Sequence, residues 1–277
     1  MLRRPDSFLF LSILFVFAAV VPPRAAKAEE PVSALPNAHA HNDYYHKRPL
    51  LDALAHGFCS VEADVFLVDG QLLVGHAKFE LKPERCLESL YLSPLKERIL
   101  KIGGRVYPDA DRFVLLVDIK EAGEKTYQAL HTLLARYNDI LTRVEDGQVT
   151  PGAVTVIVSG DRPVELMTGQ ETRYAGIDGR LGDLDSDLPA HLLPLISDHW
   201  GRNFRWQGLG PMPPEEREKL RSIVGKAHEK GRLVRFWAIP HREVLWAELE
   251  AAGVDLINAD DLPRLRRFLT REVDERQ

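Results

Sequence analysis

Short apolar runs alternate with segments of helical spacing along most of this chain. Nine runs predict strands because they are short and rich in β-branched and other apolar residues. These predicted strands are residues 35–40, 60–67, 71–75, 112–119, 153–159, 174–178, 193–198, 233–238 and 256–259. Helical spacing and end signals predict helices over residues 49–56, 124–137, 213–230, 241–252 and 261–275.

Repeated alternation of strand and helix predicts a parallel sheet with helices on its outside. Residues 29–277 have the length of one closed (β/α)8 TIM barrel, and no linker divides them, so we expect a single domain. A doubly wound open sheet is the alternative. It loses support because no strand is followed by the glycine-rich phosphate-binding segments of nucleotide-binding sheets.

The first 28 residues have the order of a secretory signal peptide. A basic start at Arg3 and Arg4 precedes the uncharged apolar run 7–21, and Ala26-Lys27-Ala28 then offers small residues at alternating positions. The run is shorter than the roughly 20 residues of a membrane span, although a short anchor is the alternative. We therefore expect a cleaved leader over 1–28 and a secreted or periplasmic protein with no membrane span in residues 29–277.

Charge and cysteine content restrict the partners. The formal net charge of −5 becomes more negative once the basic leader is removed. An acidic protein is poorly suited to bind nucleic acid or anionic lipid, so we expect no nucleic-acid partner. We also expect a monomer, although the sequence does not decide the oligomeric state. Export permits a disulfide between Cys59 and Cys86, but the sequence does not decide whether they pair.

Glu62 and Asp64 lie two residues apart in the predicted strand 60–67. Side chains alternate faces along a strand, so both carboxylates point one way, while Val61 and Ala63 point the other. In a barrel the apolar face meets the helices, which leaves the carboxylates inside. Unpaired buried carboxylates are costly, and a hard cation bound through their oxygens would remove that cost. Ordinary acids on an exposed edge strand are the alternative.

Asp118 follows five apolar residues, 113–117, as expected where a strand buried on both faces emerges. The C-terminal ends of barrel strands form the active-site face, which makes Asp118 a candidate functional residue. Lys120 shares its face and could bind a phosphate oxygen or hold Asp118 in place. A purely structural Asp–Lys pair is the alternative.

Histidines lie at matching predicted strand ends. His39 and His41 belong to the end of strand 35–40, and His76 follows strand 71–75. Imidazoles can give and take a proton near neutral pH, and two of them on opposite sides of a metal would suit phosphoryl transfer. For any one histidine taken alone, a buried structural role is the alternative.

The order His41, Glu62-x-Asp64, His76 and Asp118-x-Lys120 resembles the superfamily of phosphatidylinositol-specific phospholipase C-like phosphodiesterases. That group includes glycerophosphodiester phosphodiesterases and the spider-venom sphingomyelinase D enzymes. Within it, His-Ala-His-Asn-Asp-Tyr, Lys-Arg-Pro-Leu, Ser-Val-Glu-Ala-Asp-Val and Val-Gly-His are most similar to the altered-inheritance-of-mitochondria type. The resemblance covers residues 37–120, returns at 236–239 and 252–260, and implies a (β/α)8 barrel.

The resemblance also implies roles for single residues. Glu62, Asp64 and Asp118 match the family's metal ligands, and the oxygen ligands favour Mg²⁺ or Ca²⁺. His41 and His76 match its two catalytic histidines, with His39 as a rival to His41. Substrate-binding residues would be Lys120, matching a lysine near the phosphate, Trp237, matching an aromatic at the pocket wall, and Asn42.

Departures from the family pattern leave the substrate open. Asn42-Asp43 follows His41 where glycerophosphodiesterases have Arg-Gly, and Ala77 stands where they often have Asp. We expect a phosphoric diester hydrolase or lyase acting on a glycerophosphodiester- or phospholipid-like small molecule or lipid, with water or a substrate hydroxyl as nucleophile. A glycosidase using Glu62 and Asp118, or a non-catalytic ligand-binding barrel, are the alternatives. Region 180–212 is a candidate functional loop, in which His199 and Trp200 could line a pocket or pin the chain.

Overall fold

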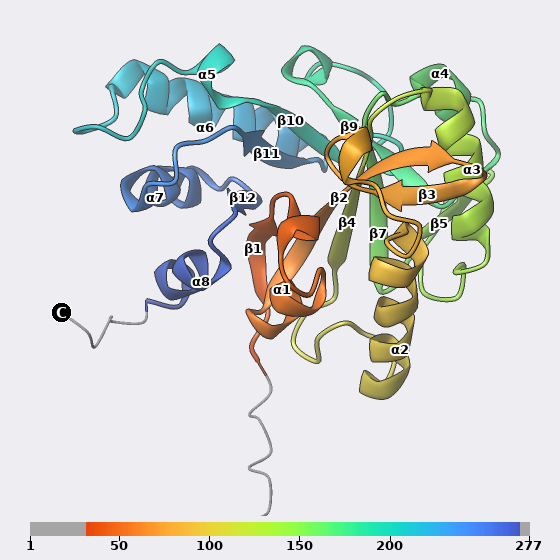
Figure 1. Ribbon diagram of the computed structural model, residues 1–277. Coiled ribbons are helices and arrows are strands. Elements are labelled where there is room, and N and C mark those ends of the chain that lie inside the picture. The colour runs from red at the N-terminus through yellow and green to blue at the C-terminus, as the bar shows by residue number, and fades with distance from the viewer. Residues whose placement is uncertain (1–31, 272–277) are drawn as a thin grey trace, which may run out of the picture. The chain divides into compact units, whose positions relative to one another are not determined.

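The computed structural model describes residues 32–271, in which eight parallel strands form a closed barrel (Figure 1). The barrel strands are β1 (Leu35–Ala40), β2 (Phe58–Val68), β4 (Phe113–Ile119), β7 (Val154–Gly160), β9 (Ala175–Gly179), β10 (Leu195–His199), β11 (Leu233–Trp237) and β12 (Leu256–Ala259). β1 pairs with both β12 and β2, which closes the sheet. The predicted (β/α)8 barrel is confirmed, and the open sheet is excluded. The predicted leader, 1–28, lies outside the described residues.

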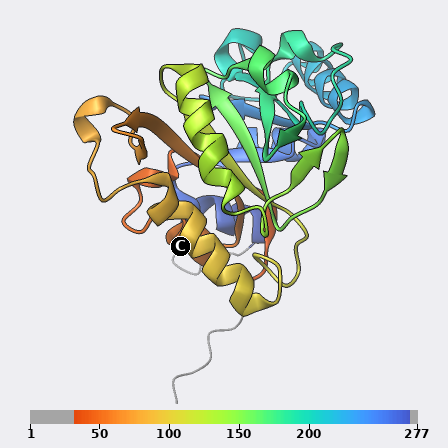
Figure 2. The same cartoon turned by 90° about the vertical axis from the view of Figure 1, so that its right-hand side faces the viewer.

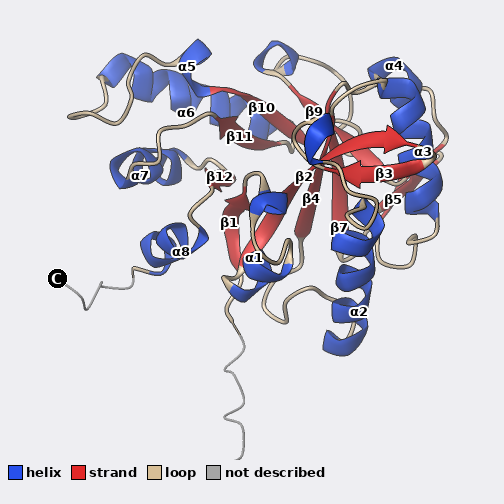
Figure 3. Ribbon diagram, in the orientation of Figure 1, coloured by secondary structure: helices blue, strands red, loops and turns tan. Residues whose placement is uncertain are grey.

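Helices surround the barrel (Figure 3), and Figure 2 shows α2 and α3 in front of the strands that they cover. The helices are α1 (Leu51–Ala55), α2 (Ser93–Ile102), α3 (Gly123–Ala135), α4 (Val164–Thr168), α5 (Trp200–Asn203), α6 (Pro214–Glu229), α7 (Glu243–Ala252) and α8 (Leu262–Thr270), with single helical turns at η1 (Asp43–Tyr45), η2 (Lys78–Glu80), η3 (Glu88–Leu92) and η4 (Leu181–Asp183). The sequence did not predict α2, α4 or α5. No helix within residues 32–271 is long and apolar enough to cross a membrane.

The barrel interior is apolar at one end and polar at the other. Its lower layer is a cluster of buried side chains from alternate positions of the strands: Val114, Leu116, Ile157, Leu195 and Leu256. Two residues further along the same strands and on the same face come Asp118, Ser159, Ser197 and Asn258. The two-residue period of the strands therefore puts apolar packing beneath the polar groups, which gather at the C-terminal ends.

An unpredicted hairpin extends from β2. The strand runs past the barrel to Val68, and a two-residue turn at Asp69 and Gly70, both with positive φ, returns the chain as β3 (Gln71–Val74). This turn is typical of tight hairpins. β3 is antiparallel to β2, so it is not a barrel strand. The prediction that His76 lies at an end equivalent to those of the barrel strands is therefore wrong.

Three further features complete the fold. A small antiparallel sheet joins β6 (Gln148–Thr150), β5 (Arg143–Glu145) and β8 (Thr172–Arg173). Region 180–212 is not one loop, because β10 and α5 lie within it, as the predicted strand 193–198 indicated. Cys59 is buried, Cys86 is partly buried, and both are free thiols, so the two do not pair.

Candidate active site

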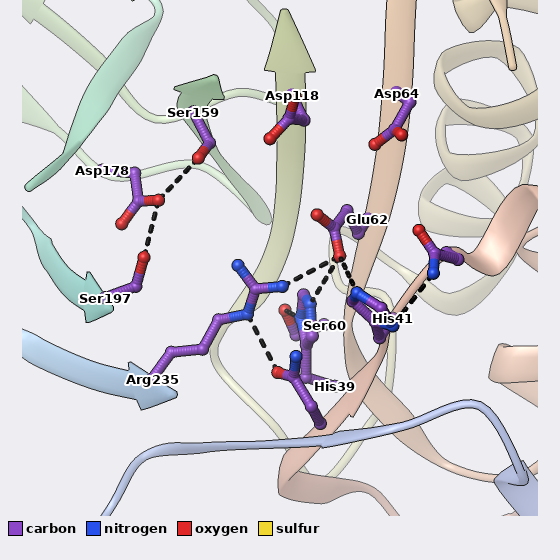
Figure 4. A network of polar contacts seen from close by, with 12 residues as sticks. His39, His41, Ser60, Glu62, Asp64, Asp118, Ser159, Asp178, Ser197 and Arg235 are labelled. Carbon is purple, nitrogen blue, oxygen red and sulfur yellow. Dashed lines mark hydrogen bonds and ion pairs between the residues drawn. The ribbon is translucent and has the colours of Figure 1, made fainter. Parts of the chain in front are cut away.

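Three carboxylates converge at the C-terminal end of the barrel. Glu62 and Asp64 lie on the same face of β2, and β4 places Asp118 directly beside Asp64 in the register of the two strands. Figure 4 shows the three side chains at neighbouring positions near the end of β4. Each offers an oxygen, and these oxygens all lie within 4.8 Å of one another. Ligands of one hard cation at 2.3–2.6 Å would have about this spacing.

Asp64 has one oxygen saturated and the other free. Its Oδ2 lies 2.6 Å from Lys120 Nζ, 2.7 Å from the Tyr44 hydroxyl and 2.9 Å from His76 Nδ1. Its Oδ1 is buried and has no hydrogen-bond partner among the described residues. A buried carboxylate oxygen without a partner is costly, so this atom fits the role of a cation ligand.

Glu62 is held by a buried arginine from across the barrel. Arg235 donates from Nη2 to Glu62 Oε2 at 2.9 Å and from Nε to Asn258 Oδ1 at 2.9 Å (Figure 4). Burial by itself raises the pKa of Glu62, but the Arg235 charge and the nearby His39 outweigh it and lower the pKa. Glu62 is therefore ionised at neutral pH, even though it is almost fully buried.

The ionised forms of Asp118 and Asp64 are destabilised by their surroundings. Burial, followed by the negative charges of Asp64 and Glu62, raises the pKa of Asp118 to about 6, against the opposing effect of Lys120. The pKa of Asp64 is raised as well, chiefly by burial and by Glu62. Lys120 Nζ lies 3.2 Å from Asp118 Oδ1 and bridges the two acids. A bound divalent cation would relieve this destabilisation, since it stabilises the charged form of every carboxylate.

Each of the two predicted catalytic histidines has one ring nitrogen fixed by a carboxylate. His41 Nδ1 lies 2.8 Å from Asp260 Oδ1, and His76 Nδ1 lies 2.9 Å from Asp64 Oδ2. The hairpin explains the contact between His76 and Asp64. β3 runs back along β2, so that the Gly75 N–H donates to the Asp64 carbonyl at 3.1 Å and His76 follows beside Asp64. The other ring nitrogen of His41, Nε2, lies 3.8 Å from Glu62 Oε2.

His39 occupies a different environment from His41. It is fully buried, its Nδ1 lies 2.7 Å from Ser60 Oγ, and its Nε2 lies 3.6 Å from Glu62 Oε2. Burial and the Arg235 charge lower its pKa to about 4, so the ring is neutral at physiological pH. His41, by contrast, is about a quarter exposed (27 %) and lines the cavity. The geometry thus separates the two rivals, with His39 beneath the site and His41 at it.

The turn after β1 is fixed by a buried carboxylate. Asn42 has a left-handed conformation, and Asp43 then accepts the backbone N–H of Leu50, which has a positive φ of 61°. This bond closes residues 43–50 into a compact loop. The loop delivers the Tyr44 hydroxyl to Asp64, which gives the His-Asn-Asp-Tyr segment a structural reason.

A cavity of about 370 Å³ opens over these groups. Seven of the eight predicted site residues line it: His41, Asn42, Glu62, His76, Asp118, Lys120 and Trp237. The eighth, Asp64, lies in the carboxylate cluster. Trp237 ends β11 and meets His199 edge-on, with ring centroids 4.7 Å apart. Trp200 is fully buried against Phe204, so it pins the chain and does not reach the cavity.

The structure adds residues that the sequence analysis did not select. Arg180, Ser159 and Arg235 line the cavity. Buried Asp178 accepts hydrogen bonds from Ser159 and Ser197 at 2.6 and 2.8 Å (Figure 4), and from Arg180 at 2.8 Å. Asp260, which orients His41, was also not assigned a role. A signal was present for Arg235, because a charged residue two positions before Trp237 in an apolar strand must share its inward face.

Comparison with known proteins gives a consistent family. A family model described as AIM6-like phosphodiesterase domain matches residues 30–107 and 102–177. An altered inheritance of mitochondria protein 6 homolog from Arthroderma benhamiae is 31% identical over 254 residues, covering 81% of this chain and 81% of that protein. Altered inheritance of mitochondria protein 6 from Eremothecium gossypii is 28% identical over 279 residues, covering 88% and 72%.

Solved structures share the fold at low sequence identity. A calcium-dependent phosphoinositol-specific phospholipase C from a Pseudomonas species has a TM-score of 0.53 at 12% identity, covering 84% of this chain and 88% of that one. A glycerophosphodiester phosphodiesterase from Parabacteroides distasonis has a TM-score of 0.52 at 15% identity, covering 86% and 99%. At these identities the likeness establishes the barrel fold alone.

Proposed function

The chain belongs to the AIM6-like phosphodiesterase family, and from this premise we propose that it is an exported, metal-dependent enzyme that cleaves phosphoric diesters. The observation that carries the proposal is the set of three carboxylates with oxygens within 4.8 Å, flanked by two carboxylate-bound histidines around one cavity. The expected leader supports export, and a glycerophosphodiester- or phospholipid-like molecule is the substrate class.

Glu62, Asp64 and Asp118 would hold the cation, and their all-oxygen donor set suits Mg²⁺ or Ca²⁺. When bound, the cation neutralises charge that develops on the phosphoryl oxygens. The three carboxylates face two cationic side chains, Arg235 and Lys120, which leaves one net negative charge. With a divalent cation in place the balance becomes one net positive charge, which matches the single negative charge of a phosphodiester.

His41 and His76 would move the protons of the reaction. Asp260 and Asp64 fix Nδ1 of His41 and of His76, so that the Nε2 atoms would give and take protons in the cavity. One imidazole would deprotonate the attacking oxygen, from water or from a hydroxyl of the substrate, and the other would protonate the leaving alcohol. Lys120, between Asp64 and Asp118, is placed to meet a phosphoryl oxygen.

The side wall of the cavity would select the alcohol. Arg180 is held rigidly by Asp178, with Nη1 2.8 Å from Oδ2, and presents hydrogen-bond donors beside Ser159. Trp237 supplies an apolar surface supported by His199. A wall with both hydrogen-bond donors and an apolar surface suits an alcohol that has hydroxyl groups and an apolar portion. Glycerol esters, inositol esters and lysophospholipids therefore stay within the proposed substrate class.

The test is a panel of phosphodiesters followed by ³¹P NMR with Mg²⁺, Ca²⁺ or EDTA. Glycerophosphodiesters, lysophospholipids, sphingomyelin, phosphoinositides and bis(p-nitrophenyl) phosphate should be included, because the resonance of the product separates a monoester from a cyclic ester. We expect cation-dependent cleavage of at least one class, lost in Glu62→Gln and retained in Glu145→Gln, which changes an exposed acid of the small sheet. Cleavage that survives thorough chelation would contradict the proposal.

A further inference from the structure

A second cavity lies at the opposite end of the barrel. The small sheet of β5, β6 and β8 lies against the start of β7, where the Thr142 N–H donates to the Val154 carbonyl at 2.8 Å. Between this sheet and the first residues of the barrel strands is a cavity of about 280 Å³, here called the N-terminal pocket. Its lining includes Val114, Val149, Ile157, Arg173, His191 and Leu233. None of its lining residues lines the candidate active site.

Arg173 is buried in the wall of this pocket without a counter-charge. Only 4 % of the residue is exposed, and within residues 32–271 the polar contact of its guanidinium is Nη2 at 3.0 Å from His191 Nδ1. In the same part of the chain Nε and Nη1 have no hydrogen-bond partner, and no carboxylate forms an ion pair with the guanidinium. Burial lowers the pKa of Arg173, and burial together with Arg173 lowers the pKa of His191, so His191 is the neutral acceptor of the pair.

The lining holds a second guanidinium, that of Arg112, which is exposed to solvent, and the rest of the lining is apolar or already satisfied. Aliphatic side chains of the strands form most of the wall, and the hydroxyls of Thr142 and Thr155 lie 3.2 Å from each other. A buried guanidinium with two free nitrogens in such surroundings is unfavourable unless an anion pairs with it. The pocket therefore has one unmet requirement, a single negative charge beside Arg173.

We propose that the N-terminal pocket binds a carboxylate carried on a short aliphatic chain, with Arg173 pairing with the carboxylate and the strand residues enclosing the chain. Of the two guanidinium groups in the lining, only that of Arg173 is buried, and one buried positive charge matches a monoanion better than a dianionic phosphate. The apolar lining matches an aliphatic body, and the volume, small for a ligand pocket, restricts its length. The proposal is independent of the reaction at the other end of the barrel.

The test uses thermal melting and calorimetry of the whole protein with octanoate, octan-1-ol and octyl phosphate in EDTA. Chelation prevents a carboxylate from binding through a cation at Glu62, Asp64 and Asp118. A ligand that binds the folded state raises the melting temperature in a saturable way. We expect octanoate to do so and to bind at least tenfold more tightly than the alcohol or the phosphate ester.

Two substitutions, with a third as a control, locate the site. Arg173→Met should weaken octanoate binding at least tenfold and raise the melting temperature of the unliganded protein, because it removes an unpaired buried charge. Arg143→Met, on the neighbouring strand β5 and outside the pocket lining, should bind octanoate like wild type. Val149→Trp narrows the exposed rim of the pocket and should block binding with Arg173 intact. Equal affinity for octanoate and octan-1-ol, or octanoate binding unchanged by both Arg173→Met and Val149→Trp, would overturn the proposal.

Discussion

The Asp43→Asn variant should gain stability relative to wild type as the pH rises from acidic to alkaline. Asp43 is fully buried, with Oδ2 on the Leu50 N–H and Oδ1 without a partner among the described residues. Burial raises its pKa from 3.8 to about 7, although the Leu50 bond opposes the shift. Asn has a similar shape and an oxygen for the same bond, but it is neutral at every pH.

The sign and size follow from linkage. A group with a raised folded-state pKa stabilises the protein fully below its unfolded pKa, and this stability is lost as pH rises through the folded value. A shift of about 3 units corresponds to about 4 kcal/mol in full, of which about 2.5 kcal/mol develops between pH 5 and pH 8. Between pH 5 and pH 8 the unfolding free energy of the variant should therefore rise by roughly that amount relative to the unfolding free energy of wild type.

Urea unfolding of both proteins at pH 5, 6.5 and 8 measures the effect. The contributions of the other titrating groups cancel when the unfolding free energies of the two proteins are subtracted. Asp52→Asn is the matched control from the same region. Burial acts to raise the pKa of Asp52, but hydrogen bonds from Arg48 outweigh it and lower the pKa below its usual 3.8. Asp52 is therefore fully ionised in both the folded and the unfolded protein from pH 5 to pH 8, so the stability difference between this variant and wild type should stay constant over that range. A stability difference for Asp43→Asn that is constant across the three pH values would refute the reasoning.

Three other substitution or labelling experiments follow from the packing. Arg235→Met leaves Glu62 buried without its partner and should cost about 3–5 kcal/mol of unfolding free energy, measured by denaturant titration; a neutral effect would contradict the described pair. Gly160 has φ of 70°, and a Cβ there would meet the Ile119 carbonyl and Asp118 Oδ1, so Gly160→Ala should lose at least about 1 kcal/mol and weaken cation binding by calorimetry. Burial raises the pKa of the Cys59 thiol to about 12, so an aromatic disulfide should label Cys86 in the native protein and Cys59 only after unfolding; simultaneous labelling would be inconsistent with this packing.

The strand and helix pattern was sufficient to predict the barrel, because each barrel strand is a short apolar run and several of the helices between them have a clear periodicity, although α2 was not predicted. The run into Asp118 and the alternation around Glu62 correctly indicated inward-facing acids at the C-terminal ends. Here local pattern and tertiary role coincide, since the face of a side chain is determined within its own strand.

Other parts of the site depend on contacts that local pattern does not contain. The hairpin that returns His76 to Asp64 depends on a reversal at Asp69-Gly70, a turn signal that the sequence analysis did not use. Arg235 and Glu62 are distant in sequence, and their pairing requires the closed barrel. The same holds for Asp260 and His41, which meet only because β12 pairs with β1. The roles assigned to the site residues stay predictions until activity is measured.

The rate of cation-dependent diester cleavage in His41→Ala and His76→Ala, beside His39→Ala, tests the central claim most directly. His39 is the matched control, because it lies on β1 two residues before His41 but is buried beneath the cavity. With the best substrate of the panel, each of the first two variants should lose about 10²–10⁴-fold in rate, as expected for removal of a general acid or base. Both of these variants should still bind the cation, as measured by calorimetry. His39→Ala should retain more activity than either. Full activity in both His41→Ala and His76→Ala would contradict the account.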